Sequence, residues 1–359
     1  MATHKHYLGL IERYKDRLPV SATTRVISLN EGNTPMIQLQ NIPRMLGKDV
    51  DIYVKFEGLN PTGSFKDRGM TMAVTKAVEE GSEAIICAST GNTSASAAAY
   101  AARAGIKAFV LIPEGKIALG KLAQTLMYNA TIIQINGNFD KGMELVKEVA
   151  HHAPVTIVNS INPFRIDGQK TAAFEIVDDL GFAPDYHCLP VGNAGNITAY
   201  WKGYTEYARD RICSNRPVMC GYQAAGAAPF VAGHMIDNPE TVATAIRIGH
   251  PQSWDFAWAA QKESGGWFDK FTDEKILAAQ KMLSQYEGIF CEPASATSLA
   301  GAMRDIASGK IPEGSKIVCT LTGNGIKDPE IAMQQCADAK PVTIDANLDA
   351  VKRAILDCL

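Results

Sequence analysis

The stretch Asn60-Pro61-Thr62-Gly63-Ser64-Phe65-Lys66-Asp67-Arg68-Gly69 decides how the rest of this sequence is interpreted. Proline fixes φ and glycine can take a positive φ, so Asn-Pro-Thr-Gly is typical of a tight turn. Ser64 is suited to cap a helix, Asp67 favours its first turn, and apolar residues follow at helical spacing. Lys66 is therefore predicted in the first turn of a helix, directly after a tight loop.

The predicted position of Lys66 suits a reactive amine. A cation at the N-terminus of a helix opposes the helix dipole, which favours the neutral form of the side chain. A lysine that forms a Schiff base needs that neutral form. The loop does not match the phosphate-binding pattern of Gly, four residues and Gly-Lys-Ser/Thr. A solvated surface charge is the commoner role of a single lysine, so the functional interpretation depends on segments downstream.

The length and composition indicate a globular protein with two domains. A chain of 359 residues is long for one hydrophobic core. It is 46% hydrophobic and 20% charged, close to average usage. The net charge of −3 gives no electrostatic reason to expect binding to nucleic acid or to an anionic membrane surface. No run approaches the ~20 apolar residues of a membrane span.

The N-terminus and the cysteines favour a cytoplasmic protein. Residues 1–7 lack the charged region and apolar core of a signal peptide. Eight cysteines are scattered without a Cys-x-x-Cys pair, and Cys87, Cys188 and Cys319 lie in apolar, strand-like runs. Buried free thiols in a reducing compartment are expected. The seven histidines form no metal-binding pattern, and no metal is assigned.

Short apolar strands alternate with helices along much of the chain. The predicted strand and helix pairs are 84–88 with 92–104, 108–112 with 117–129, 131–135 with 140–152, 156–158 with 168–180, and 188–191 with 196–210. Further strands are predicted at 36–39, 51–57, 218–222 and 316–321, and further helices at 7–18, 252–264, 272–285, 293–308 and 346–359. This alternation indicates an α/β fold with parallel, doubly wound sheets.

Two loops between a strand and a helix have the composition of anion sites. Ser89-Thr90-Gly91-Asn92-Thr93-Ser94 opens an alanine-rich helix, and Gly192-Asn193-Ala194-Gly195-Asn196 opens another. Free N–H groups at a helix N-terminus bind anions, and glycine lets the backbone approach a ligand closely. The second loop lacks the Gly-x-Gly-x-x-Gly pattern of dinucleotide sites. An ordinary helix start remains open as the explanation of each loop.

Two further segments carry polar side chains next to predicted strands. Thr322 follows the strand 316–321 and precedes two glycines, and a simple turn is an equally good interpretation. Asn159-Ser-Ile-Asn-Pro-Phe-Arg165 contains hydrogen-bond donors that suit a phosphate, and arginine matches that geometry. From the residues alone, a surface charge is the more frequent role for Arg165.

Together these segments resemble the fold-type II pyridoxal-phosphate enzymes and, within them, the threonine synthases. The similarity covers about residues 30 to 330 and is carried by Lys55-Phe-Glu-Gly-Leu-Asn-Pro-Thr-Gly-Ser-Phe-Lys-Asp-Arg-Gly69, Pro190-Val-Gly-Asn-Ala-Gly-Asn-Ile197, Ile246-Arg-Ile-Gly-His-Pro-Gln-Ser-Trp254 and Cys291-Glu-Pro-Ala-Ser295. It implies the tryptophan synthase β-like fold, with two doubly wound parallel-sheet domains and the cofactor between them. The larger domain is expected at 1–49 plus 155–359, and the smaller, inserted one at 50–154.

The resemblance also implies which residues hold the cofactor, pyridoxal 5'-phosphate. Lys66 is expected to bind it covalently and to act as the catalytic acid and base. Asn92 is expected to donate to its 3-hydroxyl, and Thr322 to lie beside its pyridine nitrogen. The cofactor phosphate is expected in the loop formed by Gly192, Asn193, Ala194, Gly195 and Asn196.

The substrate implied by the resemblance is O-phospho-L-homoserine, which loses phosphate and gains water at Cβ to give L-threonine. Its α-carboxylate is assigned to Ser89, Thr90 and Thr93. Its phosphate is assigned to Asn159, Ser160 and Arg165, with Lys55 as a weaker candidate. The family is commonly dimeric, so a homodimer is expected. No role is assigned to Asn324, His250, Arg247 or Glu292.

Two alternatives stay open. A threonine/serine dehydratase or a cysteine synthase shares the fold, although dehydratases often carry Gly-Gly-Gly-Gly in the phosphate loop. A non-catalytic module that binds an amino acid keeps the fold without the reaction, and the intact Lys66 disfavours it.

Overall fold

The computed structural model describes residues 6–114, 119–136, 139–160, 162–338 and 341–357. The chain divides into two compact units, Met1–Lys327 and Asp328–Leu359. The first unit contains both sheets and every residue of the candidate site. The second consists of a short helix and an amphipathic helix, and each unit is described by itself.

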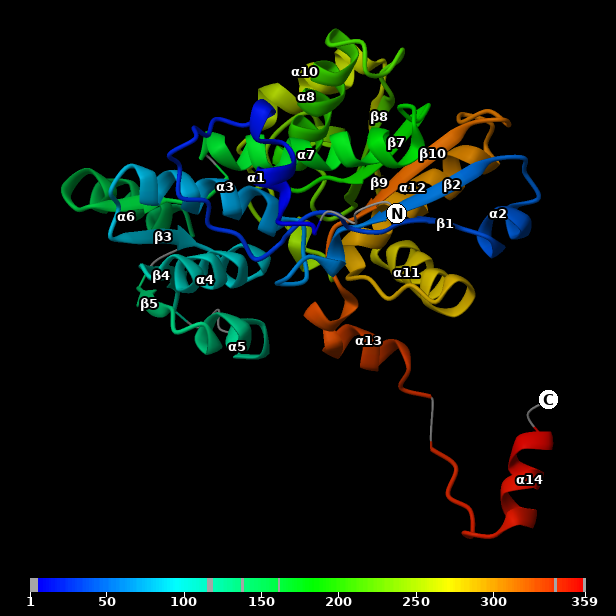
Figure 1. Ribbon diagram of the computed structural model, residues 1–359. Coiled ribbons are helices and arrows are strands. Elements are labelled where there is room, and N and C mark those ends of the chain that lie inside the picture. The colour runs from blue at the N-terminus through cyan, green and yellow to red at the C-terminus, as the bar shows by residue number, and fades with distance from the viewer. Residues whose placement is uncertain (1–5, 115–118, 137–138, 161, 339–340, 358–359) are drawn as a thin grey trace. The chain divides into compact units, whose positions relative to one another are not determined.

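A six-stranded sheet forms the centre of the first unit (Figure 1). Its order is β1-β2-β10-β7-β8-β9, and only β1 is antiparallel to its neighbour. The strands are β1 (Met36–Gln38), β2 (Asp51–Phe56), β7 (Tyr186–Pro190), β8 (Val218–Ala224), β9 (Trp267–Phe271) and β10 (Lys316–Leu321). The early strand β2 therefore pairs with the late strand β10.

A four-stranded parallel sheet with the order β5-β4-β3-β6 lies in the same unit, in the cyan to green part of Figure 1. Its strands are β3 (Ala84–Ala88), β4 (Lys107–Pro113), β5 (Thr131–Ile135) and β6 (Val155–Ile157). The predicted α/β class with two parallel sheets is confirmed. The sheets differ from the expected domain ranges at two strands, because β2 belongs to the larger sheet and β6 to the smaller one.

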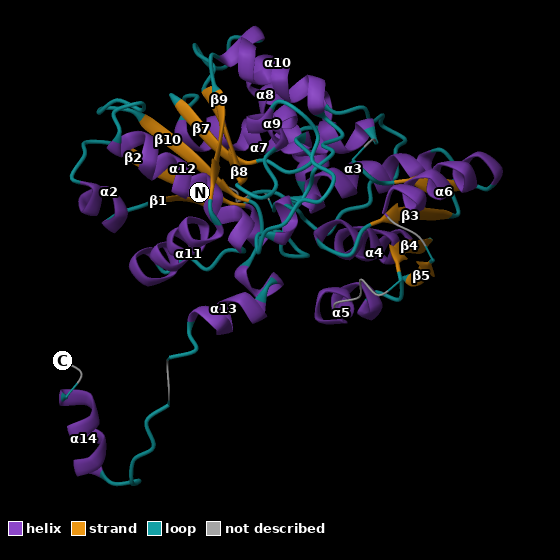
Figure 2. Ribbon diagram, turned by 180° about the vertical axis from the view of Figure 1, so that it is seen from behind, coloured by secondary structure: helices purple, strands orange, loops and turns teal. Residues whose placement is uncertain are grey.

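Helices connect and cover the strands (Figure 2). In the first unit they are α1 (Leu10–Arg13), α2 (Asn41–Leu46), α3 (Lys66–Glu79), α4 (Asn92–Ala104), α5 (Leu119–Met127), α6 (Phe139–His152), α7 (Pro163–Leu180), α8 (Gly195–Arg209), α9 (Pro229–Ala232), α10 (Trp254–Ser264), α11 (Asp273–Glu287) and α12 (Pro293–Ala307). Short 3₁₀ turns follow at Lys15–Arg17, Glu57–Leu59, Thr244–Ile246 and Gly325–Lys327.

The larger sheet is buried on both faces, because successive side chains of a strand point to opposite sides. Cys188 of β7 packs in a core with side chains of α11 and α12, whereas its neighbour Leu189 packs in a core with side chains of α7, α8 and α10. In β10, Cys319 packs in the first of these two cores and Val318 in the second. This explains why these strands read as continuous apolar runs in the sequence.

The helix that begins with Lys66 is anchored by a buried ion network. Arg68 of α3 contacts Glu57, directly after β2, at 2.6 Å and Glu175 of α7 at 2.6 Å. Close packing of α3 on α7 requires Gly168, since a Cβ there would lie 1.9 Å from the carbonyl oxygen of Arg68. The first turn of α3 is thereby fixed against both neighbouring elements.

Several element boundaries differ from the prediction. The helix expected at 168–180 begins at Pro163, because Asn162 caps it by accepting from the Phe164 N–H at 3.0 Å. The expected opening helix 7–18 is only α1 and a 3₁₀ turn. Ser64 is not the cap of α3: Phe65 occupies that position and no side chain caps the helix.

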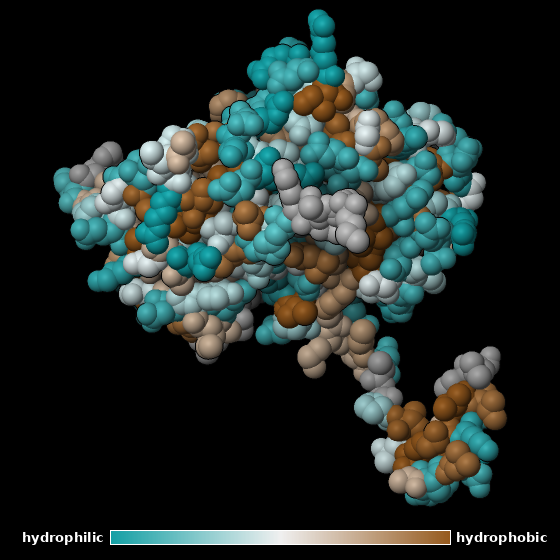
Figure 3. Space-filling view, viewed as in Figure 1, coloured by the Kyte–Doolittle hydropathy of each residue, from teal (hydrophilic) through white to brown (hydrophobic). Residues whose placement is uncertain are grey.

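The second unit contains α13 (Pro329–Gln335) and α14 (Leu348–Leu356). Asn347 caps α14 by accepting from the Ala350 N–H at 2.9 Å. One side of α14 carries the exposed apolar residues Leu348, Val351 and Ile355. Brown, hydrophobic atoms gather in the C-terminal part of the chain in Figure 3. Among the described residues, no helix combines the length and apolar character that crossing a bilayer requires.

The described cysteines are all free thiols, and six of the seven are buried. Cys188, Cys220 and Cys319 lie in register on neighbouring strands of the larger sheet. The expectation of buried free thiols is confirmed for these positions, and Cys358 lies outside the described residues.

Candidate active site

Lys66 and Thr322 are brought together by backbone hydrogen bonds between two segments far apart in the sequence. The Phe65 N–H donates to the Thr322 carbonyl at 2.9 Å, and the Asn324 N–H donates to the Gly63 carbonyl at 3.0 Å. The loop before α3 is thus joined to the segment after β10. The predicted proximity of these two candidate residues follows from this junction.

The Lys66 amine lies in an environment that disfavours its charge. Burial, and then the neighbouring cation of Arg165, lower its pKa from 10.5 to about 7, while Glu292 acts in the opposite direction. About half of the amine is then neutral at pH 7, against less than about 0.1% for an ordinary lysine. The ammonium lies 4.3 Å from the centre of the Phe65 ring. The amine is therefore available as a nucleophile and as a base at neutral pH.

Glu292 is a site residue to which the sequence interpretation gave no role. Its buried carboxylate accepts from the Asn92 side-chain amide at 2.9 Å and from the Thr322 hydroxyl at 3.2 Å. The Thr322 hydroxyl also lies 3.0 Å from that of Ser295. A glutamate directly before a proline that opens an apolar helix was the only local signal.

The glycine-rich loop after β7 forms a cradle at the start of α8. Ala194 has a left-handed backbone, with φ of 63°, and α8 begins at Gly195. The segment before α10 holds this loop in place, since the Ser253 N–H donates to the Asn193 carbonyl at 3.2 Å. A Cβ on Gly192 would lie 3.1 Å from the Ile246 Cα, so this glycine permits close packing.

Asn196 is a buried hydrogen-bond donor in the first turn of α8, at the cradle. Its side-chain nitrogen is buried and has no hydrogen-bond partner among the described residues. A buried donor without a partner costs about 1–3 kcal/mol, and the first N–H groups of α8 also lack intrahelical partners. These donors fit a phosphate dianion at the positive end of the helix dipole.

Arg165 is buried in the first turn of α7 and is not a surface charge. Its Nη1 donates to the Val158 carbonyl at 3.2 Å, while its Nε has no partner among the residues that the structure describes. Burial lowers its pKa to about 10, so it remains charged at neutral pH. A buried cation with a free donor beside Lys66 is suited to a second anion.

Asn159 has a structural role at the end of β3. Its side-chain oxygen accepts from the Ala88 N–H at 3.0 Å, and its nitrogen donates to the Ala88 carbonyl at 3.0 Å. It thereby fixes the loop that follows, in which the Ser89 hydroxyl accepts from the Gly91 N–H at 3.2 Å. The assignments of Asn159 and Ser160 to the substrate phosphate, and of Ser89, Thr90 and Thr93 to a carboxylate, stay predictions.

The prediction that Lys55 is a weaker candidate for the substrate phosphate is wrong. Its amine is fully buried and pairs with Glu175 at 3.0 Å and with Asp179 at 3.4 Å. It also donates to the Thr34 carbonyl at 2.7 Å. These partners satisfy its charge and donors, so it belongs to the ion network under α3 and is not available to a substrate phosphate.

The other residues without an assigned role lie in ordinary contacts. The Asn324 side chain donates to the Gly58 carbonyl at 3.3 Å, in the junction below Lys66. His250 is exposed and contacts Asp237 at 3.0 Å, and Arg247 is exposed and lies 3.8 Å from Glu240. In the described part of the chain, no group of three His, Cys, Asp or Glu side chains has a metal-binding arrangement.

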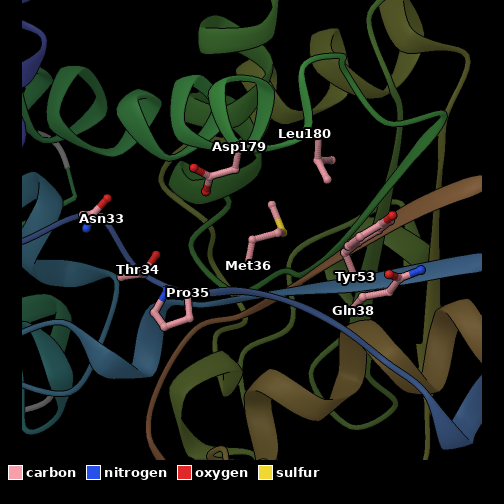
Figure 4. Close-up of a pocket in the computed structure, with 8 residues that line it drawn as sticks. All are labelled: Asn33, Thr34, Pro35, Met36, Gln38, Tyr53, Asp179 and Leu180. Carbon is pink, nitrogen blue, oxygen red and sulfur yellow. The ribbon is translucent and has the colours of Figure 1, made fainter. Parts of the chain in front are cut away.

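A pocket of about 410 Å³ lies elsewhere in the first unit (Figure 4). It is lined by Asn33, Thr34, Pro35, Met36, Gln38, Tyr53, Asp179 and Leu180. None of the candidate site residues lines it. It borders the far side of the ion network, where Asp179 and Thr34 contact Lys55, and is therefore not the candidate active site.

Comparisons with known proteins show the family to which the chain is similar. The family model described as "Pyridoxal-phosphate dependent enzyme" matches residues 27–323. The chain is similar to the threonine synthases of Synechocystis sp., at 56% identity over 97% of this chain and 90% of the relative, and of Mycobacterium tuberculosis strain H37Rv, at 58% identity over 96% and 95%. The threonine synthase of Methanocaldococcus jannaschii is 49% identical over 96% of this chain and 86% of the relative.

Solved structures show the same fold at lower identity. Maize serine racemase has a TM-score of 0.72 at 22% identity, covering 86% of this chain and 92% of its own. A processed form of threonine deaminase isoform 2 from Solanum lycopersicum has a TM-score of 0.71 at 20% identity, covering 86% and 84%. At these identities the likeness concerns the fold alone.

Proposed function

Because this chain belongs to the family of pyridoxal-phosphate dependent enzymes, we propose that it acts as a threonine synthase. The reaction converts O-phospho-L-homoserine and water to L-threonine and phosphate. The observation that carries the substrate assignment is the buried Arg165, whose Nε has no partner among the described residues and whose charge acts on Lys66. Identity of 56–58% to threonine synthases over nearly the full chain supports it.

The residues present fit the cofactor. The Lys66 amine, neutral in about half of the molecules at pH 7, is available for covalent attachment, and the loop 192–196 offers the unpartnered Asn196 donor to the cofactor phosphate. Asn92 would donate a hydrogen bond to the 3-hydroxyl of the cofactor, and Thr322 would lie beside its pyridine nitrogen. When bound, pyridoxal phosphate supplies an electron sink for the electron pair left when the Cα proton departs.

The protein's own groups move the protons and stabilise the leaving group. Lys66 Nζ, neutral in about half of the molecules at pH 7, takes the Cα proton and then moves protons at Cβ. Arg165 neutralises the charge that develops on the departing γ-phosphate. The protons taken from Cα and Cβ are returned to Cγ, which becomes the methyl group, and to Cα. Water adds its hydroxyl at Cβ and its remaining proton leaves with the phosphate, so the sum is substrate plus water to threonine plus phosphate.

The remaining polar groups orient the substrate and favour this reaction type. Ser89, Thr90 and Thr93, at the start of α4, would bind the α-carboxylate with the free N–H groups of that helix. A hydroxyl at Thr322, unlike a carboxylate, would not hold the pyridine nitrogen protonated. Weaker electron withdrawal then favours elimination and replacement over transamination.

The proposal also covers the location, the oligomeric state and the domain division of the enzyme. We expect a cytoplasmic homodimer, as the composition and the family resemblance imply. We also expect a larger domain at 1–49 plus 155–359 and a smaller one at about 50–154. The separate four-stranded sheet supports this division, with β2 and β6 as the exceptions at its boundaries.

Product analysis tests the function. The purified protein with pyridoxal phosphate should release phosphate from O-phospho-L-homoserine and form one threonine per phosphate, and Lys66→Ala should abolish both. Ammonia release from threonine or serine, without phosphate release, would identify a dehydratase. Binding of the cofactor without turnover of any of these amino acids would identify a non-catalytic binding module.

A further inference from the structure

Glu292 connects two residues that come from separate parts of the first unit. Asn92 opens α4, which follows β3 of the smaller sheet, and Thr322 follows β10 of the larger sheet. The Glu292 carboxylate accepts from Asn92 Nδ2 at 2.9 Å with one oxygen and from Thr322 Oγ1 at 3.2 Å with the other. One side chain therefore holds both groups in a fixed relation.

The carboxylate is itself confined. Glu292 is 1% exposed, and its N–H donates to the Gly323 carbonyl at 3.0 Å. A Cβ on Gly323 would lie 2.4 Å from the Glu292 carboxyl carbon, so only glycine leaves room for it. Ser295 fixes the same turn by accepting from the Gly323 N–H at 2.9 Å. The position of the carboxylate is thus set by the fold.

Glu292 also provides negative charge in a region that contains two cations. The charged groups that act on the Lys66 amine are Arg165 from α7, which disfavours the ammonium, and Glu292 from the start of α12, which favours it. The neighbouring Asp67 is directed away, to Thr62 at 2.6 Å and Ser96 at 2.6 Å. Glu292 is therefore the carboxylate that balances Arg165 at Lys66.

We propose that Glu292 is a positioning residue of the active site: its carboxylate orients the Asn92 amide and the Thr322 hydroxyl, and it places a negative charge in the site opposite Arg165. The inference rests on the proposed function only where Asn92 and Thr322 are taken to contact the cofactor. The Asn92 amide has two N–H groups, so one can donate to Glu292 and leave the other for a ligand. The Thr322 hydroxyl has a single hydrogen. Glu292 accepts it in the cofactor-free protein and fixes the rotamer of the side chain, from which the hydrogen can turn to an unprotonated pyridine nitrogen.

Two variants separate the effect of the Glu292 charge from the effect of its hydrogen bonds to Asn92 and Thr322. Glu292→Gln keeps the size but removes the charge, and its amide nitrogen cannot accept a hydrogen bond. Glu292→Asp keeps the charge but is one methylene shorter, so it cannot reach both partners. Glu274→Gln, at an exposed position of α11, is the matched control.

The first measurement titrates Lys66 in the full-length, cofactor-free protein. The rate at which an amine-reactive reagent labels Lys66, followed by peptide mass spectrometry, is recorded against pH. Glu292→Gln should lower the midpoint by about one pH unit, because a neighbouring opposite charge has been removed. Glu292→Asp and Glu274→Gln should keep the native midpoint. This readout does not depend on the identity of the substrate, so failure of the phosphate assay would leave it standing.

The second measurement is the affinity for pyridoxal 5'-phosphate. Both Glu292 variants should bind it about tenfold more weakly, as expected when a hydrogen bond to a charged group is lost, while Glu274→Gln binds it normally. Native midpoint and native affinity in Glu292→Gln would overturn the proposal. If Glu292→Gln does not fold, native affinity in Glu292→Asp would overturn the bridging role by itself.

Discussion

Arg68 and Glu175 form a two-point ion pair inside the protein, with Nη1 donating to Oε1 at 2.8 Å and Nη2 to Oε2 at 2.6 Å. Arg68 makes a second such pair with Glu57, at 2.6 and 2.8 Å. The arginine therefore joins the helix of Lys66 to two other elements at a position two residues beyond the reactive amine.

Loss of Arg68 should be severe, because it removes the cation that pairs with the buried Glu57 and leaves the buried Glu175 with Lys55 as its remaining cation. Arg68→Met is expected to lower the free energy of unfolding by about 3–5 kcal/mol, measured by urea denaturation. Lys48→Met removes an exposed pair with Glu313 and should cost less than about 1 kcal/mol. A cost for Arg68→Met as small as that of the control would show that the network does not stabilise the fold.

Lys66 should make the stability of the cofactor-free protein depend on pH. Its pKa is about 7 in the folded state and near 10.5 when unfolded, so the unfolded chain binds more protons between these values. Stability then rises with pH in that window. Relative to Lys66→Met, the native protein should gain about 2 kcal/mol between pH 7 and pH 9, as followed by urea denaturation at each pH. Parallel pH profiles for the two proteins would refute the lowered pKa.

Arg165 should act on the reaction and on Lys66 at once. Arg165→Met is expected to lower kcat/KM for phosphate release by about 10²–10³-fold, the usual cost of removing a charge-stabilising donor. It should also raise the labelling midpoint of Lys66, because a like charge has been removed. Arg209→Met, at an exposed position, is the control. A native midpoint in Arg165→Met would place its guanidinium away from the amine.

Asn196 should have opposite effects on stability and on cofactor binding. Its buried amide nitrogen has no partner among the described residues, so Asn196→Ala should leave the stability of the cofactor-free protein unchanged or raise it. The same change should weaken pyridoxal 5'-phosphate binding by about tenfold. Calorimetry on the cofactor-free protein checks the effect on stability, and a cofactor titration checks the effect on affinity. Unchanged affinity would show that the amide does not face the phosphate.

Elements with strong local signals could be predicted from the sequence. The strands Ala84–Ala88, Thr131–Ile135 and Lys316–Leu321 and the helix Asn92–Ala104 were predicted with their observed bounds. The strands β3 and β10 are buried along nearly their whole length, whereas β5 is a partly exposed edge strand with a β-branched sequence. Gly105, with φ of 77°, ends the helix as expected. Local sequence and tertiary packing agree in these places.

The start of α7 and the strand β9 could not be predicted in the same way. The pair Asn162-Pro163 is compatible with a turn as well as with a helix start. In the structure Asn162 caps α7 and Pro163 is its first residue, so Arg165 lies inside the helix. β9, with the sequence Trp-Phe-Asp-Lys-Phe, is an edge strand with a charged, partly exposed face, which weakens its signal.

The role of Glu292 depends on partners that are distant in the sequence. Asn92 is 200 positions away and Thr322 is 30 positions away, so no spacing rule connects them. For the same reason the sequence does not exclude Lys55 as a ligand candidate, since its partner Glu175 lies on a helix far along the chain.

The pairing of β2 with β10 has a consequence for the order of assembly. During synthesis, residues 51–56 leave the ribosome long before their partners at 316–321, and the loop before Lys66 is joined to Thr322 just beyond. The contacts that complete the site span almost the whole first unit, which favours slow folding. We therefore expect the nascent chain to acquire cofactor binding only after β10 has emerged.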